Sequence, residues 1–366
     1  MSMDWMQGEM SLTKFTELPL EPLPKISASR YLSLKQCPLK EIWASSRQPL
    51  LPCNPAAYLG TAIHRMLELV FQGRISNMDE LSYLWDNEIE RLEKEMLENP
   101  VEKHFVSLRM SILNFEVKKL LAFKMIKPLL KKSPQRNNSG LKRSTEAWVR
   151  TANGKVVGKI DLVKELNSEI EIIDYKTGPL TAGSTSGSAK EEYLLQVKIY
   201  AALYHAMHGK WPVRLTLVGI NQETITIDVD SEECAKLLQE AVKNLDDINE
   251  LIEAGLKPED FAQPSPEACK YCLFRPACSK YWGVRSEDGN WPTDARGIIT
   301  SKTELENGLF RVVVNTIAGE IAIRGLSPER HSFLKDDIES IVFCNLWNDK
   351  ADGFFVEKMF TISYAL

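Results

Sequence analysis

The first third of the chain carries apolar side chains at helical spacing. Residues 60–72 place them three and four positions apart, and residues 78–98 repeat the pattern with acidic side chains on the opposite face. We predict a helix over each segment and a third helix over about 102–130. The N-terminal region is therefore expected to be largely helical.

The period then changes to two. Alternating segments over 144–151, 155–166 and 169–177 are separated by the turn pairs Asn153-Gly154 and Asn167-Ser168, which is typical of three antiparallel strands. A loop rich in Gly, Ser and Thr follows. Further elements are predicted over 193–208 (helix), 213–220 and 223–229 (strands), and 231–254 (helix, with Ser231 as its N-cap). Together these segments predict an α/β core with helices beside a central sheet.

The last part of the chain predicts a separate β-domain. A Pro- and Cys-rich segment over 264–282 is followed by a linker and then by short alternating segments over 309–316, 320–325, 338–347 and 353–360. We expect four or five strands around a helical insert near 328–335. These strands would form a small β-barrel, of which the OB-type barrel is one possible form. The predicted organisation is an N-terminal tail (1–24), an α/β domain (25–283), a linker (284–295) and the barrel (296–366).

Composition and charge narrow the class of protein. With 366 residues, 44% hydrophobic and 26% charged, the chain is unlike disordered, collagenous or membrane-embedded proteins. It contains neither a long apolar run nor a basic N-terminal leader, so we expect a cytoplasmic protein without membrane association. The net charge of −5 is not that of a generally basic nucleic-acid binder. Residues 118–143 nevertheless hold nine Lys or Arg and no acidic residue, as a solvated helix face or a phosphate-contacting surface would.

Two adjacent predicted strands carry a candidate catalytic cluster. Asp174 and Lys176 are two apart and share one face of their strand, and the hairpin brings Asp161 alongside. Converging carboxylates in an apolar sheet need a compensating cation, and hard oxygen ligands select Mg²⁺ or Mn²⁺. Such an ion would activate water for attack on a phosphodiester, with Lys176 orienting the water or neutralising developing charge. A structural ion pair at a strand end is the alternative.

Other candidate residues have ordinary explanations when taken singly. His64 lies on an amphipathic helix, as many core histidines do, and Glu146 is an acidic residue on the first strand of the meander. Gln196 and Tyr200 are four apart on one helix face, which most often reflects packing. The cysteines are less ordinary, because three of the seven, Cys269, Cys272 and Cys278, fall within ten residues. An odd number of thiols in a reducing compartment favours metal or cluster ligation over disulfides.

Several short blocks, in order, resemble the RecB-like branch of the PD-(D/E)XK nucleases, specifically the iron-sulfur group that includes AddB and the CRISPR-associated single-strand exonucleases. The resemblance covers residues 25–283. Its blocks are SASRYLSLKQCP, LGTAIHRMLE, EAWVR, GKIDLV, IIDYKTG, QVKIY and CKYCLFRPAC. Each block is weak alone, and their order together with the DYKT core makes the combination specific.

This resemblance implies a restriction-endonuclease-like α/β core and assigns roles to the candidates. His64, Asp161, Asp174 and the backbone carbonyl of Tyr175 would bind the divalent metal, and Lys176 would be the catalytic lysine. Glu146 would support metal or water, and Gln196 and Tyr200 would lie beside the active site and DNA. Cys37, Cys269, Cys272 and Cys278 would hold a [4Fe-4S] cluster, although four thiolates also suit zinc.

The implied function is a metal-dependent DNA nuclease, expected to be an exonuclease on single-stranded or unwound DNA in repair, recombination or defence. The chain lacks the nucleotide-binding motif of a helicase, so unwinding would come from a helicase partner. A spacer-trimming CRISPR exonuclease and a non-catalytic iron-sulfur subunit of a helicase-nuclease complex are the alternatives. In the barrel, Phe310, Trp347 and Phe354 are expected in the core or, alternatively, stacked on bases.

Overall fold

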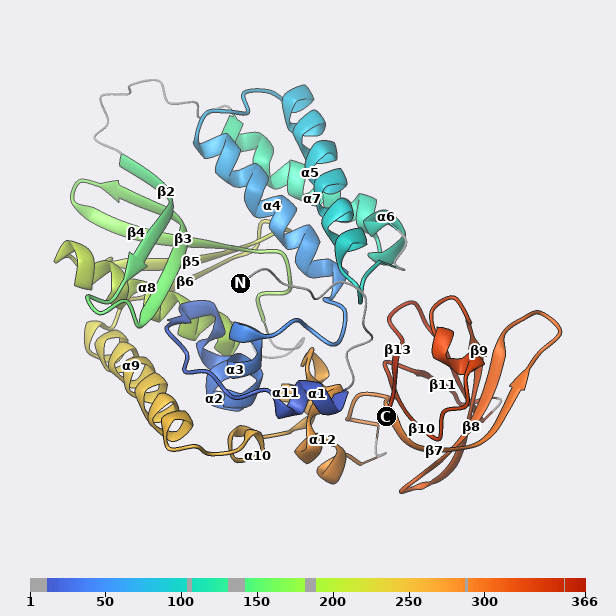
Figure 1. Ribbon diagram of the computed structural model, residues 1–366. Helices are drawn as coiled ribbons and strands as arrows, with labels where there is room; N and C mark the ends of the chain where they lie inside the picture. Colours follow the sequence, from blue (N-terminus) through green and yellow to red (C-terminus); the bar gives the residue numbers. More distant parts are fainter. Residues whose placement is uncertain (1–11, 104–106, 131–141, 182–188, 287–288, 352) are drawn as a thin grey trace.

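The computed structural model describes residues 12–103, 107–130, 142–181, 189–286, 289–351 and 353–366. Two β-sheets dominate this part of the chain (Figure 1). The first has the order β1-β3-β4-β5-β6, and β2 pairs with the other edge of β3. Its strands are β1 (Ile26–Ser27), β2 (Lys142–Arg150), β3 (Val156–Leu166), β4 (Glu169–Lys176), β5 (Arg214–Gly219) and β6 (Thr224–Asp228).

The predicted meander is confirmed, since β2, β3 and β4 pair antiparallel in chain order. The next pairing, β4 with β5, is parallel and therefore needs a long crossover. Helix α8 (Glu191–His208) supplies it, and α9 (Ser231–Glu253) packs against α8. The N-cap of α9 is Asp230 rather than the predicted Ser231, because the Asp230 carboxylate accepts hydrogen bonds from the backbone N–H groups of Glu232 and Glu233.

Helices cover both faces of the first sheet, as Figure 1 shows. Ile172 packs into a core with α8 and α9, and its neighbour Ile173 points to the opposite face, into a core with helices of residues 55–130. The alternation of a strand buried on both sides produces this division. The first layer includes α1 (Leu12–Glu17), η1 (Ala28–Arg30), α2 (Tyr31–Gln36) and α3 (Pro38–Ser46), and the second includes α4 (Pro55–Phe71), α5 (Met78–Glu98), α6 (Leu108–Ser111) and α7 (Phe115–Leu130).

The single helix predicted over about 102–130 is wrong. The chain forms α6, leaves the helical conformation at Ile112, and starts α7 after Asn114, whose φ of 59° is left-handed. Short polar side chains such as that of Asn tolerate this conformation and so break a helix. Within the basic segment, Lys119 pairs with Asp86, whereas Lys124 and Lys127 are exposed on α7. Residues 131–141 of that segment lie outside the described residues.

The C-terminal strands form an open sheet, and the predicted closed barrel is wrong. The sheet has the order β11-β12-β9-β8-β7-β10-β13, and β11 and β13 stand at its two ends. The β13 edge does not need closure because it lies against the first domain, where the Tyr364 hydroxyl donates to the backbone carbonyl of Leu50. The elements are β7 (Ala295–Glu304), β8 (Phe310–Thr316), β9 (Gly319–Leu326), η3 (Ser332–Lys335), β10 (Ser340–Cys344), β11 (Trp347–Asp349), β12 (Phe354–Val356) and β13 (Ile362–Ala365).

The cysteine-rich segment lies between the two sheets. It includes α11 (Pro266–Lys270), η2 (Arg275–Ala277) and the start of α12 (Ser279–Val284), and η2 contacts α1. The preceding helix α10 (Pro258–Phe261) contacts α3. The buried Arg275 guanidinium pairs with Asp294 at 2.6 Å, and Asp294 also accepts from the backbone N–H of Asn345 at 2.8 Å. Asp294, at the end of the predicted linker, is thus buried and connects the cysteine-rich segment to the second sheet.

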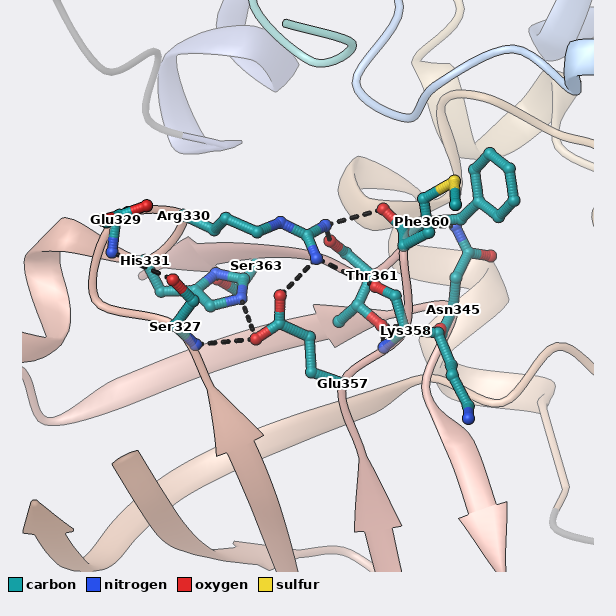
Figure 2. Close-up of polar contacts among 11 residues, drawn as sticks. Ser327, Glu329, Arg330, His331, Asn345, Glu357, Lys358, Phe360, Thr361 and Ser363 are labelled. Atoms are coloured by element: carbon teal, nitrogen blue, oxygen red, sulfur yellow. Dashed lines mark hydrogen bonds and ion pairs between the residues drawn. The ribbon is translucent and has the colours of Figure 1, made fainter. Parts of the chain in front are cut away.

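A second polar network fixes the chain between β12 and β13 (Figure 2). The Arg330 guanidinium pairs with Glu357 and donates to the backbone carbonyls of Lys358, Met359 and Thr361. This segment carries Met359 and Phe360, which pack against the helical core of α4–α7. The network therefore holds the C-terminal sheet against the helices.

Across the described ranges, no helix combines the length and apolar character needed to span a bilayer.

Candidate active site

The two candidate carboxylates lie where strands β3 and β4 separate. Their ladder extends from Leu166–Glu169 to Leu162–Ile173 and stops before Asp161 and Asp174. The unpaired backbone N–H of Tyr175 instead donates to Asp161 Oδ2 at 2.7 Å. Strand β4 continues on its other edge, where Lys176 still pairs with Gly219 of β5. The carboxylates are thus held at a local opening of an otherwise continuous sheet.

A phase shift in β3 accompanies this opening. Ile160 and Val163, three residues apart, both lie in the core shared with α8 and α9, whereas Leu162 lies in the core shared with α4–α7. A regular strand would place Ile160 and Leu162 on the same face. On β2, Glu146 has a φ of 51°, and it stands between Thr145, paired with Leu162, and Ala147, paired with Ile160. Such an irregularity re-aims side chains, and it brings Glu146 opposite Asp161.

Lys176 and Asp174 form a buried network with α8. The Lys176 ammonium lies 2.7 Å from Asp174 Oδ2 and donates to Gln196 Oε1 at 2.5 Å. The Gln196 amide donates to Asp174 Oδ1 at 3.3 Å and to the Tyr200 hydroxyl oxygen at 2.8 Å. Gln196 therefore contacts the Asp174 carboxylate directly, and Tyr200, one helical turn further along α8, contacts Gln196.

His64 approaches from the opposite side, on α4. The helix starts at Pro55 with Asn54 as its cap, and His64 Nδ1 lies 3.1 Å from Asp161 Oδ1. Burial disfavours the imidazolium, but the hydrogen bond and charge of Asp161 outweigh it and raise the pKa of His64. Gly60 permits the close approach of α4, since a Cβ there would lie 3.3 Å from Thr177 Oγ1.

The donor set fits a hard divalent cation. Burial, opposed by the Lys176 ammonium and aided by the charge of Asp161, raises the pKa of Asp174 to about 6. Within the described residues, Asp174 Oδ2 has the Lys176 ammonium 2.7 Å away as its ionic partner but meets no hydrogen-bond criterion. A buried carboxylate oxygen without a hydrogen bond is the group that a metal ion would satisfy.

Four cysteines line one small cavity. Cys37, at the junction of α2 and α3, faces Cys269, Cys272 and Cys278, with Trp43 and Tyr281 in the wall. Burial and the neighbouring thiols raise the pKa of Cys269 and that of Cys278 to about 12, against backbone hydrogen bonds. Four cysteines that share one protein cavity are a donor set that a thiophilic metal or cluster would stabilise as thiolates.

Neither site is closed around an ion. No three or more His, Cys, Asp or Glu side chains among the described residues converge closely enough to hold a metal as they stand. At the carboxylates, Lys176 and His64 occupy oxygens that a metal would need. Binding at either site would therefore tighten the ligands around the ion.

Three further residues belong to the site and were not predicted. The Tyr193 ring lies 4.5 Å from the Lys176 ammonium, Lys159 pairs with Glu146, and Gly158 gives Tyr200 room, since a Cβ there would lie 2.6 Å from its ring. Tyr193 is three residues before Gln196 on α8, so helical spacing could have indicated it. The other two depend on how β2, β3 and α8 cross.

The family model of the PD-(D/E)XK nuclease superfamily matches residues 25–279. The matched range includes both carboxylates, Lys176 and the four cysteines. The chain belongs to the PD-(D/E)XK nuclease superfamily. Its α/β architecture, with the carboxylates at an opening of the sheet, is consistent with that fold.

Individual relatives are distant. The chain is 24% identical over 131 residues to the CRISPR-associated exonuclease Cas4 of Francisella tularensis subsp. novicida (strain U112). The aligned region makes up 36% of this chain and 60% of that protein. Among solved structures, it is similar to SSO0001 (12% identity, TM-score 0.30, covering 73% of this chain and 92% of that one) and to VC1899 from Vibrio cholerae (15%, 0.18, 63% of each chain).

Proposed function

We propose that this nuclease is a metal-dependent DNA exonuclease that hydrolyses single-stranded or unwound DNA. The observation that carries the proposal is the convergence of Asp161, Asp174 and Lys176 at the opening between β3 and β4. The Lys176 ammonium lies 2.7 Å from Asp174, and Asp161 is held by the Tyr175 N–H near enough for its charge to act on Asp174. Two carboxylates beside a lysine are the groups that a metal-dependent phosphodiesterase uses.

In this proposal, His64, Asp161, Asp174 and the backbone carbonyl of Tyr175 hold Mg²⁺ or Mn²⁺. The ion would lower the pKa of a water molecule and stabilise negative charge on the phosphate. Lys176, positioned by Gln196 and Tyr193, orients the attacking water or neutralises the charge that develops as the new P–O bond forms and the old one breaks. Glu146 supports the metal or its water, and Gln196 and Tyr200 position the catalytic groups beside the DNA.

The decisive test is Lys176→Ala, assayed with labelled single-stranded DNA and Mn²⁺. We expect cleavage to fall by at least about a hundredfold, the effect of removing one transition-state charge contact, with folding and DNA binding retained. Lys198→Ala is a matched control on α8, since Lys198 pairs with Glu233 instead of the site. Cleavage by Lys176→Ala at the rate of the unsubstituted protein would contradict the assignment.

We further propose that Cys37, Cys269, Cys272 and Cys278 hold a [4Fe-4S] cluster with an architectural role. The cavity they share joins segments more than two hundred residues apart, and cross-linking so long a loop stabilises the fold. Protein purified without oxygen is expected to be brown, absorbing at roughly 400 nm as thiolate-to-iron charge transfer does. Colourless protein with stoichiometric zinc would favour the zinc alternative. As a control, Cys53→Ser should leave the colour unchanged, because Cys53 does not line the cavity.

The similarity to a CRISPR-associated exonuclease favours spacer trimming as a second candidate role. Alternatively, the nuclease acts on DNA that a helicase partner unwinds. The remaining alternative is that the chain is a non-catalytic subunit of such a helicase-nuclease complex. End-labelled linear and circular substrates test the enzymatic proposals together, because an exonuclease spares circles. Degradation of circles would contradict the exonuclease assignment.

A further inference from the structure

A row of cationic and aromatic side chains crosses the outer strands of the C-terminal sheet. The Phe354 ring on β12 lies 4.9 Å from the Arg324 guanidinium on β9 and 5.5 Å from that of Arg311 on β8. At the sheet edge, the Lys358 ammonium lies 4.2 Å from the Trp347 ring on β11. We name these five residues the Arg–aromatic row.

Strand register places the row on the face away from the sheet's own core. Val356 pairs with both Trp347 and Arg324, so these side chains share a face, and Phe354 is two residues from Val356. The alternate residues Phe310, Val312 and Ile323 are buried together on the other face. The row therefore lies on the face opposite the core of the sheet, and Trp347 is 46% exposed at its end.

This arrangement corrects the grouping of three aromatics in the sequence. Phe310 is a core residue, 6% exposed, and cannot meet a ligand. Trp347 and Phe354 belong to the surface, one exposed and the other partly buried between two guanidinium groups. Stacking on a ligand is therefore a question about these two rings only.

Local charge points to a polyanion. The row carries three cations, and one of them, Arg324, pairs with Asp349 at 3.2 Å. Among the described residues, no carboxylate pairs with Arg311, although the whole chain has a net charge of −5. Cations interleaved with aromatic rings match the alternating phosphates and bases of a nucleic acid.

We propose that the Arg–aromatic row binds single-stranded DNA, with phosphates at the cations and unpaired bases against Phe354 and Trp347. Base faces reach an aromatic ring only in an unpaired strand, so the geometry favours single strands over duplex. The inference deepens the proposed function, because a second contact on the strand would hold a substrate between cleavage events. It rests on that function only for the choice of DNA as the polyanion.

Binding is tested with the full-length protein in EDTA, using a fluorescent oligothymidylate of about 20 nucleotides, long enough to span one such site. We expect Phe354→Ala to weaken affinity about tenfold and Arg311→Gln to lower the slope of log affinity against log salt by about 0.7. Ile317→Ala and Lys335→Gln are matched controls on exposed positions of the same domain and should change neither quantity. Phe354→Leu, which keeps apolar volume, should also bind weakly, separating stacking from folding.

Two results would overturn the proposal. Affinity of Phe354→Leu within twofold of the unsubstituted protein, with an unchanged unfolding midpoint, would make the row a structural feature only. Equal losses for single-stranded and duplex DNA would replace base stacking by plain charge attraction. The Lys176→Ala variant tests the proposed catalytic function separately. If this variant binds the oligonucleotide normally but still cleaves DNA, the catalytic assignment is contradicted and the proposed DNA binding by the Arg–aromatic row is unaffected.

Discussion

Glu146 holds a backbone conformation that residues with a side chain avoid. Its φ of 51° lies in the left-handed region, which costs a non-glycine residue about 1–2 kcal/mol. The cost falls in the middle of a strand, directly opposite Asp161, where glycine would relieve it. Retained strain beside a candidate active site suggests that the carboxylate itself is needed.

This reasoning yields a paired prediction. Glu146→Gly should be more stable than Glu146→Ala by about 1 kcal/mol, because both lose the carboxylate but only glycine relaxes the backbone. Both variants should lose DNA cleavage to a similar extent. Urea unfolding and initial cleavage rates measure the two effects. Equal stabilities would show that the backbone conformation carries no strain, and undiminished cleavage would remove Glu146 from the site.

At the scale of elements, close contact between β3 and α8 positions the catalytic network. Gly158 lies under the Tyr200 ring, and a methyl group there would sit 2.6 Å from a ring carbon. Gly158→Ala should push α8 from the sheet, destabilising the protein by about 1–3 kcal/mol and slowing cleavage through the displaced Gln196. Gly283→Ala is the control and should not destabilise the protein, because an added Cβ there would meet no atom within 4 Å. Full activity of Gly158→Ala would show that α8 does not position the site.

The same elements show what local patterns can predict. Period-two alternation and the turn pairs specified the antiparallel meander, and the motif spacing brought Asp161, Asp174 and Lys176 together, because each depends on neighbours in sequence. The phase shift at Asp161 follows from how β2 and β3 twist, and β1, only Ile26–Ser27, is too short to carry a period. The prediction of a closed barrel was wrong for a similar reason, because the β13 edge is covered by a segment about three hundred residues away in the sequence.

At the scale of the whole molecule, one buried ion pair joins the cysteine-rich segment to the C-terminal sheet. Arg275 and Asp294 are 3% and 0% exposed, and Asp294 also accepts from the Tyr281 hydroxyl at 2.8 Å and the Asn345 backbone N–H. Tyr281 and Arg275 both line the cavity of the four cysteines. The ligand cavity and the docking of the second sheet therefore depend on the same carboxylate.

We accordingly expect Asp294→Asn to disturb both regions at once. It leaves the Arg275 guanidinium buried without a charged partner, a defect that costs about 3 kcal/mol or more. Unfolding by urea should shift by that amount, retained iron or zinc should fall, and limited proteolysis should cut before β7. Asp247→Asn is the control, because Asp247 faces Lys243 at 4.0 Å on the solvent side of α9, where a lost pair changes stability by less than about 0.5 kcal/mol. Asp294→Asn could instead expose the C-terminal sheet to proteolysis while the metal content and the cysteine-rich segment stay intact. That result would show that the two regions are independent and that the ion pair stabilises only the C-terminal sheet.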